Sequence, residues 1–549
     1  MPKVPTIEID DKTIYFPLKY KPREYQIEAL DFMKKSILTG NRFILNNLPT
    51  GTGKSYLIMM FANWYKNFVN TSAKFDVLTN SKILQEQYMR DFDFINNYKG
   101  RSNYYCDKYD TDCANGKELC KILKSPCDAC PYDIAKNRWI AGDIGLTNFH
   151  LFNTISLYQT DLIKRREGNV LIIDESHDFE SVFSDFLSTK ISAKSLKRCG
   201  FNLKEVSDLD DKFISKIKYL DKYLEFLERK LIPMLENKHN KFELEIKNTS
   251  STKKKTELSN YVQYIEGKLL SFKHLFESHK NDPSNIVLDI IVNKTEKMYS
   301  GVELQTQHVW VYEYIQDYIW KHYDHVIFMS ASILDKKMFS FINGLEDELT
   351  SYYEIPSPFP IKNRKIFYMK VGKMNFTNKE ETFKKQLPWI EKILNKYKDK
   401  KGIIHTTNYE IADWLKNNLK NKRLLFHDTE NRNEMLDKHL SSKEPTVLVS
   451  PSMMSGIDLK DDLARFQILL KVPYPNISSN KIKARQKTNK HWYAWKSVVD
   501  TLQMYGRSTR SDTDFSDTFI LDSNFSDMMK YNSHLIPNYM LEAVKVLKI

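Results

Sequence analysis

The chain has 549 residues, of which 41% are hydrophobic, so it is long enough for three or four domains with buried cores. Its formal net charge of +13 favours a polyanionic partner, nucleic acid first, although a generic lysine-rich surface would give the same balance. No apolar run is long enough to span a bilayer and the first residues lack the apolar core of a secretory signal, so we expect neither a membrane protein nor a secreted one.

A glycine-rich loop follows the first predicted elements. Residues 1–20 are expected to form short strands, and an amphipathic helix follows through Phe32. An apolar run then precedes the loop and a helical stretch follows it, which is the order that a phosphate-binding loop requires. Its residues are Pro49, Thr50, Gly51, Thr52, Gly53, Lys54 and Ser55. The glycines turn backbone N–H groups toward a phosphate, Lys54 reaches the β- and γ-phosphates, and Ser55 holds Mg²⁺.

Five of the six cysteines fall in one short window after a predicted strand over residues 74–79 and a helix over residues 82–92. They are Cys106, Cys113, Cys120, Cys127 and Cys130. The last two have the spacing of a chelating pair, and the window contains no histidine. An all-thiolate metal site is therefore predicted, and both zinc and an iron–sulfur cluster accept four cysteines.

The next predicted strands cover residues 144–148 and 170–173, and the second ends in two acids and a histidine. Four apolar residues in a row are typical of a buried parallel strand, and ligands bind at the carboxyl ends of such strands. Asp174 is expected to hold Mg²⁺ through water. Glu175 would orient or deprotonate the attacking water, and His177 would couple the site to its neighbours.

Residues 179–320 are rich in Lys, Glu, Leu and Tyr with helical periodicity, so we expect a mostly helical insertion rather than part of a sheet. Within it, residues 238–256 are expected to form an exposed charged loop or hairpin tip. An apolar strand at 325–332 returns the chain to the first sheet. A second, mostly parallel sheet is then predicted from strands at 366–370, 402–405, 424–427, 447–450, 468–472 and 518–521.

The predicted helix from Trp492 ends in a polar motif. Gln503, Arg507 and Arg510 have the spacing i, i+4, i+7 and would share one helix face. Two arginines on one face can reach a γ-phosphate that the first sheet binds. A solvated basic face is the alternative interpretation of the same spacing.

Together these motifs resemble those of superfamily 2 helicases of the XPD/DinG iron–sulfur group, over nearly the whole chain. Residues 174–177 resemble the DEAH box with Ser176 in place of alanine, and Gln26 resembles the glutamine that reads adenine. The remaining matches are residues 49–55 to motif I, 79–81 to motif Ia, 99–106 and 130–132 to the entry and exit of the cluster domain, 330–332 to motif III, 405–407 to motif IV, 455–458 to motif V and 503–510 to motif VI.

The resemblance implies an α/β protein with two RecA-like parallel-sheet motor domains, and with a cluster domain and a helical Arch domain inserted in the first. The expected boundaries are 1–98, 141–180 and 311–350 for the first motor, 99–140 for the cluster domain, 181–310 for the Arch and 351–549 for the second motor. ATP would lie between the motors, and Asp458 and Gln503 would join the nucleotide site from the second motor.

The resemblance also implies ATP, Mg²⁺ and a 4Fe–4S cluster, with zinc the less favoured metal. The expected cluster ligands are Cys106, Cys113, Cys127 and Cys130, with Cys120 the competitor because it is predicted to lie in a helix. The implied activity is an ATP-dependent DNA helicase that moves 5′-to-3′ on single-stranded and forked DNA. We expect a monomer in the cytoplasm of a bacterial or phage-infected cell.

Two other functions are compatible with the same motifs. A translocase of the same motor class would displace bound proteins or recombination intermediates without processive unwinding. A binding module with a degenerate nucleotide site belongs to a different class, and the intact acids at 174 and 175 and arginines at 507 and 510 disfavour it.

Overall fold

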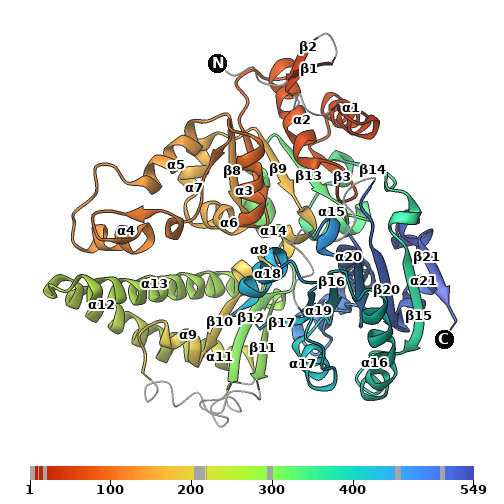
Figure 1. The fold of residues 1–549 in the computed structure, drawn as a ribbon. Coiled ribbons are helices and arrows are strands. Elements are labelled where there is room, and N and C mark those ends of the chain that lie inside the picture. Colours follow the sequence, from red (N-terminus) through yellow and green to blue (C-terminus); the bar gives the residue numbers. More distant parts are fainter. Residues whose placement is uncertain are drawn as a thin grey trace.

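The computed structural model describes residues 6–9, 12–15, 21–202, 217, 219–293, 301–428, 430–451, 459–506 and 513–548. Two large parallel sheets dominate it, and two insertions project from the first (Figure 1). Within these ranges no helix combines the length and the apolar character needed to cross a bilayer. The expected α/β class with two parallel-sheet motor domains is confirmed.

The first sheet has seven parallel strands in the order β14-β3-β13-β9-β4-β8-β5. Their bounds are β3 Phe43–Asn47, β4 Phe75–Thr79, β5 Asn96–Asn97, β8 Ile144–Asn148, β9 Val170–Asp174, β13 His325–Ser330 and β14 Thr350–Glu354. Strand β13 lies between β3 and β9 and pairs with both in parallel, so the predicted return of the chain to the first sheet is confirmed. Because the strands are parallel, the glycine loop after β3 and the acids after β9 emerge at the same edge.

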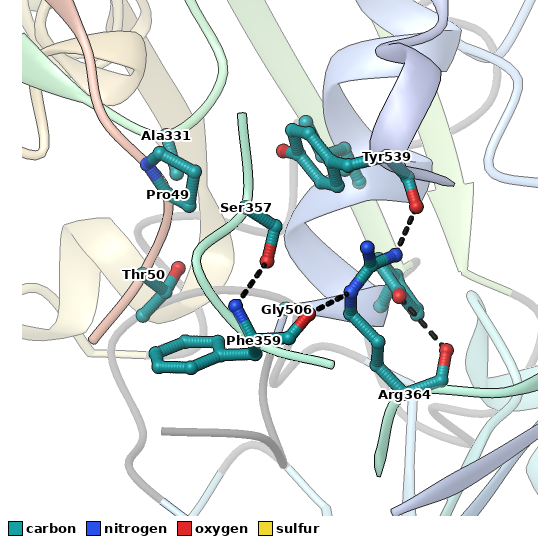
Figure 2. A pocket seen from close by; sticks show the side chains of 10 residues that line it. Pro49, Thr50, Ala331, Ser357, Phe359, Arg364, Gly506 and Tyr539 are labelled. Atoms are coloured by element: carbon teal, nitrogen blue, oxygen red, sulfur yellow. Dashed lines mark hydrogen bonds between the residues drawn. The ribbon is translucent and has the colours of Figure 1, made fainter. Parts of the chain in front are cut away.

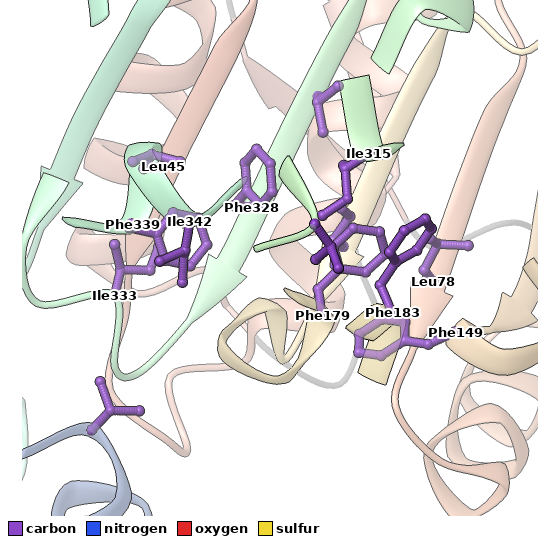
Figure 3. Close-up of a cluster of buried hydrophobic side chains, with 14 of the residues drawn as sticks. Leu45, Leu78, Phe149, Phe179, Phe183, Ile315, Phe328, Ile333, Phe339 and Ile342 are labelled. Atoms are coloured by element: carbon purple, nitrogen blue, oxygen red, sulfur yellow. The ribbon is translucent and has the colours of Figure 1, made fainter. Parts of the chain in front are cut away.

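Both faces of this sheet are buried, as the continuous apolar runs predict. Alternate residues of β3 point to opposite faces, with Phe43 and Leu45 in one core and Ile44 in the other. Figure 3 shows the first core, where Phe179 and Phe328 pack among residues from several helices. The helices that cover the two faces are α1 Glu24–Leu38, α2 Lys54–Phe68, α3 Lys82–Asp91, α6 Phe149–Tyr158, α7 Thr160–Arg166, α8 Phe179–Leu187, α14 Tyr312–Tyr318 and α15 Lys336–Asn343.

The second sheet also has seven parallel strands, in the order β17-β18-β16-β19-β20-β15-β21. Their bounds are β15 Ile366–Gly372, β16 Gly402–His405, β17 Leu424–Phe426, β18 Val447–Ser450, β19 Phe466–Leu469, β20 Asp517–Asp522 and β21 Val544–Leu547. The helices of this domain are α16 Lys379–Lys396, α17 Tyr409–Asn418, α18 Arg432–Ser441, α19 Asn480–Thr488, α20 Lys490–Tyr505, α21 Asn524–Tyr531 and α22 Asn538–Leu541. All six predicted strands are present.

The cysteine-rich segment, residues 99–140, is an insertion between β5 and β8. It contains a two-stranded ribbon and two helices, with bounds β6 Tyr105–Cys106, β7 Thr111–Asp112, α4 Cys113–Ile122 and α5 Pro131–Ala141. Asp112 caps α4 by accepting a hydrogen bond from the Asn115 N–H at 2.9 Å. Cys113 and Cys120 both lie in α4, so the expectation that helix membership sets Cys120 apart from Cys113 is wrong.

The second insertion corrects another expectation, because it contains a sheet as well as helices. Strands β10 Thr189–Ser192, β12 Gly301–His308 and β11 Ile286–Asn293 form an antiparallel sheet in that order. The helices are α9 Ala193–Lys197, α11 Leu220–Phe226, α12 Ile232–Asn248 and α13 Thr252–Asn281. Strand β10 pairs with β12 across more than 100 residues of chain, a contact that local periodicity does not encode.

The predicted charged tip at 238–256 is shorter than expected. Helices α12 and α13 run through most of it and pack as a pair, so residues 249–251 alone join them (Figure 1). In this helical pair α13 also reaches the cysteine-rich segment, where Ser259 Oγ donates a hydrogen bond to Asn115 Oδ1 at 2.7 Å. The two insertions therefore contact each other away from the sheets.

Two edge strands and one domain boundary also differ from expectation. Strand β14 adds to the first sheet beside β3, so that sheet extends to Glu354, past the expected boundary at 350. Strand β21 closes the second sheet beside β15. At the N-terminus β1 Thr6–Ile9 and β2 Lys12–Tyr15 pair as a hairpin, which agrees with the predicted strands there.

Candidate nucleotide site between the two sheets

The glycine loop has the backbone that a phosphate-binding loop needs. Gly51 and Gly53 lie in the left-handed region, with φ of +85° and +75°. Helix α2 begins at Lys54 with Gly53 as its N-cap, so the positive end of the helix dipole faces the loop. The Thr52 hydroxyl donates to the Pro49 carbonyl at 2.8 Å and braces the turn. The loop can therefore bind an anion with backbone N–H groups.

Gln26 of α1 contacts the same loop. Its Nε2 donates to the Thr52 carbonyl at 2.9 Å, and its Oε1 accepts from the Arg23 N–H at 2.9 Å. A side chain added at Gly53 would meet Gln26 Nε2 at 2.6 Å, so only glycine allows this approach. The side chain of Gln26 thus connects the first helix to the loop, while its predicted contact with adenine stays a prediction.

Lys54, at the start of α2, and Asp174, at the end of β9, come together at the loop. Lys54 is buried and its Nζ donates to the Leu48 carbonyl at 3.4 Å. The pKa of Asp174 is raised to about 6, because burial and the neighbouring Glu175 carboxylate outweigh the opposing effect of the Lys54 ammonium. Tyr88 Oη donates to Asp174 Oδ2 at 3.0 Å. A carboxylate beside a buried ammonium and a Ser55 hydroxyl at the start of α2 are the hard oxygen and cationic groups that fit Mg²⁺ and a triphosphate.

Glu175 and His177 form the turn after β9. Glu175 has a φ of +54°, a conformation that is uncommon outside glycine and is found in functional turns. Its Oε2 lies 3.4 Å from His177 Nδ1. His177 Nδ1 also lies 2.9 Å from Ser330 Oγ, at the end of β13. The acidic turn is thus held against the strand that carries the motif III-like residues.

The second motor reaches this turn through Gln503. Its Nε2 donates to Ser332 Oγ at 2.6 Å and lies 3.5 Å from His177 Nδ1. Gly506, which follows α20, lies against the glycine loop, because a Cβ there would be 3.3 Å from Thr50 Oγ1. Figure 2 shows the adjoining pocket, with Pro49 and Thr50 on one side and Arg364 and Tyr539 on the other. The two motors therefore meet at the loop and at the acidic turn.

Three expected site residues cannot be placed. Asp458, Arg507 and Arg510 lie outside the described residues, and α20 ends at Tyr505. Their predicted roles stay predictions. Sequence reasoning missed Tyr88 and Asp178, which contact the acidic turn or belong to it. An acid directly after residues 174–177 was the available signal for Asp178, whereas nothing local indicates the role of Tyr88.

The five clustered cysteines line one cavity in the cysteine-rich segment, together with Gly116, Lys117 and Pro126. Cys120 Sγ lies 3.6 Å from Cys127 Sγ. Burial raises the pKa of the Cys113 thiol to about 11, with Cys130 nearby adding to the shift. In the part of the chain described, no three His, Cys, Asp or Glu side chains lie close enough together to hold a metal ion as they stand. The donor set fits an all-thiolate group, while the choice of four ligands among the five cysteines stays open.

Comparison with known proteins gives two family matches. Residues 19–201 match the family described as the type III restriction enzyme res subunit, and residues 390–541 match the helicase C-terminal domain. A stretch of 147 residues is 26% identical to the ATP-dependent DNA helicase CHL1 of Vanderwaltozyma polyspora, covering 22% of this chain. The match spans about a fifth (18%) of the length of that curated relative.

Solved structures agree with the fold over nearly the whole chain. A structure titled XPD helicase covers 96% of this chain and all of its own, with a TM-score of 0.70 and 14% identity. The structure of S. tokodaii Xpd4 gives a TM-score of 0.56 at 14% identity with the same coverage. At these identities the likeness shows the fold. The family matches, the helicase relative and the shared fold agree with the resemblance to XPD/DinG-like helicases of superfamily 2 that the motifs predict.

Proposed function

We propose that this protein is an ATP-dependent DNA helicase that moves on single-stranded DNA, 5′-to-3′, and couples ATP hydrolysis to duplex unwinding. One observation carries the proposal: a buried lysine from the glycine loop and a buried aspartate from β9 converge where Gln503 of the second motor touches the first. A site shared by two motors can turn nucleotide binding and release into relative movement.

In this mechanism the loop N–H groups and Lys54 hold the phosphates. Ser55 and Asp174 would hold Mg²⁺, which when bound neutralises the charge of the β- and γ-phosphates. Glu175 would orient the attacking water and accept its proton. Gln26 would contact the base, and Asp458, Arg507 and Arg510 would complete the site from the second motor when the cleft closes.

The direct test replaces the loop lysine. Lys54→Ala should lower DNA-stimulated ATP hydrolysis by at least about a hundredfold, because its ammonium stabilises charge that develops in the transition state. Lys66→Ala is a matched control on the same helix, since Lys66 pairs with Asp143 at the surface away from the loop. Normal hydrolysis by Lys54→Ala would show that the site is assigned wrongly.

The unwinding part of the proposal needs its own assay. Wild-type protein should displace a strand from a 5′-tailed duplex with ATP and fail on the matched 3′-tailed duplex. Displacement from the 3′-tailed duplex alone would show that the protein moves 3′-to-5′. Stimulated hydrolysis without displacement from either would favour the protein-displacing translocase instead.

We also propose a 4Fe–4S cluster in the cysteine cavity, held by Cys106, Cys113, Cys127 and Cys130, with Cys120 the competing ligand. The supporting observation is that all five thiols line the same cavity. Protein purified without oxygen should contain about four irons per chain and absorb visible light, and zinc without iron would contradict the cluster.

The ligand set is tested by paired substitutions. Cys113→Ser should lose iron and Cys120→Ser should retain it, and the reverse result would exchange these two ligands. Cys199→Ser is the matched control, because Cys199 is also buried but lies in the other insertion. Loss of iron from this control would show that unfolding rather than ligand removal explains the other variants.

A further inference from the structure

The turn after β9 is held at two points by the segment that begins after β4. Asn80 Nδ2 donates to Asp178 Oδ2 at 2.9 Å, and Tyr88 Oη donates to Asp174 Oδ2 at 3.0 Å. Strands β4 and β9 are neighbours in the sheet, so the segments that follow them meet at its carboxyl edge. The two contacts bracket the acidic turn, one at each end.

Asp178 also faces the second motor. Helix α20 carries Lys496 and Asp500, whose side chains form an ion pair at 2.6 Å. Although burial disfavours the charge of Lys496, the carboxylates of Asp500 and Asp178 raise its pKa. On its other side Asp178 Oδ1 lies 3.5 Å from His177 Nε2, which has no hydrogen-bond partner among the described residues. Asp178 therefore lies between the loop after β4, His177 of the acidic turn and helix α20 of the second motor.

The hydrogen bond between Asn80 and Asp178 can change when its surroundings move. Asn80 Oδ1 is buried and accepts no hydrogen bond from the part of the chain that the structure describes, so within that part this amide is only half satisfied. The helix that follows starts with exposed residues, Lys82 and Ile83, so a cationic and an apolar side chain are open to a ligand at the carboxyl edge of the sheet. A ligand that moves this loop would change the Asn80 bond and, through Asp178, the position of His177.

We propose that Asp178 is a positioning residue that links DNA binding at the loop after β4 to nucleotide binding and to the second motor. The inference rests on the proposed function, because it requires both ligands. Through Asn80, bound DNA would set the position of Asp178. Asp178 would in turn set the position of the His177 ring. The Nδ1 atom of that ring contacts Ser330 and lies near Gln503. Such coupling between two ligands is reciprocal.

The experiment measures this coupling in the full chain. The dissociation constant of fluorescein-labelled oligo(dT) is measured by anisotropy, with and without Mg²⁺ and a non-hydrolysable ATP analogue, and the analogue is measured with and without oligo(dT). In wild type each ligand should change the affinity of the other by about tenfold. The coupling ratio is the dissociation constant of one ligand without the other ligand divided by its value with it. In Asp178→Asn and in Asn80→Ala this ratio should fall to within about twofold of one, and the double variant should show no further loss.

Two further variants separate coupling from folding. Asn80→Asp combined with Asp178→Asn exchanges donor and acceptor and should restore the ratio, because the amide at 178 can donate to the carboxylate at 80. Asn97→Ala is the matched control: it removes a different amide contact to α3, from Gln85 Nε2 at 3.1 Å, and should keep the wild-type ratio. A swap no better than the single variants would overturn the role of the Asn80 bond.

The remaining outcomes distinguish the two proposals. If neither ligand alters the affinity of the other in wild type, the proposed function fails. If wild type shows coupling and the Asp178→Asn ratio is unchanged, this inference fails and the proposed function stands. A lower melting temperature and weaker binding of both ligands at an unchanged ratio would also overturn it, because that result assigns Asp178 a structural role alone.

Discussion

Gly53 shows how one residue determines the geometry of the site. Its φ of +75° and its contact with Gln26 are both incompatible with a side chain. Gly53→Ala should destabilise the fold by about 1 kcal/mol and lower ATP affinity by about tenfold or more, because the loop must move away from Gln26. Melting temperature and binding of a fluorescent ATP analogue measure the two effects.

Gly40 provides the matched control for that change. It has a φ of +85° but no atom lies within 4 Å of the added carbon. Gly40→Ala should therefore show a similar loss of stability with unchanged ATP affinity. Equal losses of affinity in the two variants would contradict the role assigned to the contact between Gly53 and Gln26.

Asp174 illustrates the cost of a buried acid. Its pKa is raised to about 6, so its ionised form destabilises the nucleotide-free fold at neutral pH, and this cost shrinks as the pH falls through about 6. Asp174→Asn should therefore stabilise the protein without nucleotide or Mg²⁺ by on the order of 1 kcal/mol at pH 7.5, and by less at pH 5. Thermal unfolding at both pH values measures this, and an equal gain at both would refute the argument.

At the scale of elements, one helix is capped by a residue from another domain. Helix α19 of the second motor begins beside β11, where Asp289 accepts hydrogen bonds from the Asn480 N–H and the Ser479 hydroxyl, both at 2.7 Å. The negative charge of the Asp289 carboxylate also stabilises the positive, N-terminal end of the α19 dipole. This cap attaches the base of the second insertion to the second motor.

Removal of that cap should be measurable. Asp289→Ala should lower the free energy of unfolding by about 1–2 kcal/mol, because it leaves the N-terminus of α19 without its acceptor. Asp282→Ala is the control, since Asp282 is exposed and its carboxylate accepts hydrogen bonds from the N–H and the hydroxyl of Ser284, within its own turn. Denaturant unfolding compares the two, and an equal loss in both would argue against a cap between domains.

Helix α4 shows a second effect at this scale. Cys113 and Cys120 are two turns apart and lie on one face, and Gly116 lies on that face between them. A Cβ at Gly116 would meet Cys106 Sγ at 2.5 Å, so the glycine allows the ribbon to approach the helix. The face of α4 and the glycine on it therefore bring three cysteines close together, namely Cys106, Cys113 and Cys120.

At the scale of the whole molecule, the two motors touch at more than the nucleotide site. Trp495 Nε1 donates to the Ile333 carbonyl at 3.0 Å, and Arg485 pairs with Glu180 in a buried contact. Arg485 Nε also donates to the Val309 carbonyl at 2.7 Å, beyond the second insertion. If the motors move relative to each other, these contacts must either be preserved or break, including the one beside the second insertion.

The net charge of +13 leads to a prediction for the whole molecule. Binding of oligo(dT) should weaken at least about tenfold between 50 and 200 mM salt, because neutralised phosphates release counterions. Fluorescence anisotropy at several salt concentrations gives the slope. An affinity independent of salt would show that base stacking rather than phosphate contact dominates.

The sequence by itself determined the parts of this protein that depend on local pattern. Apolar runs predicted most strands of the two parallel sheets, and local motifs predicted the loop before Lys54 and the acids after β9. These signals are local because burial on both faces, positive φ and a helix N-terminus each depend on a few neighbouring residues. The motifs in their order also predicted a fold that solved XPD structures share.

Only the tertiary structure decided which distant segments meet. The edge strands β14 and β21, the antiparallel sheet of the second insertion and the contact of Asn80 with Asp178 all join parts of the chain that carry no mutual signal. The common cavity of five thiols likewise follows from the packing of α4 against the ribbon, not from spacing. Pairing over long distances depends on packing of the whole chain, and local periodicity does not encode it.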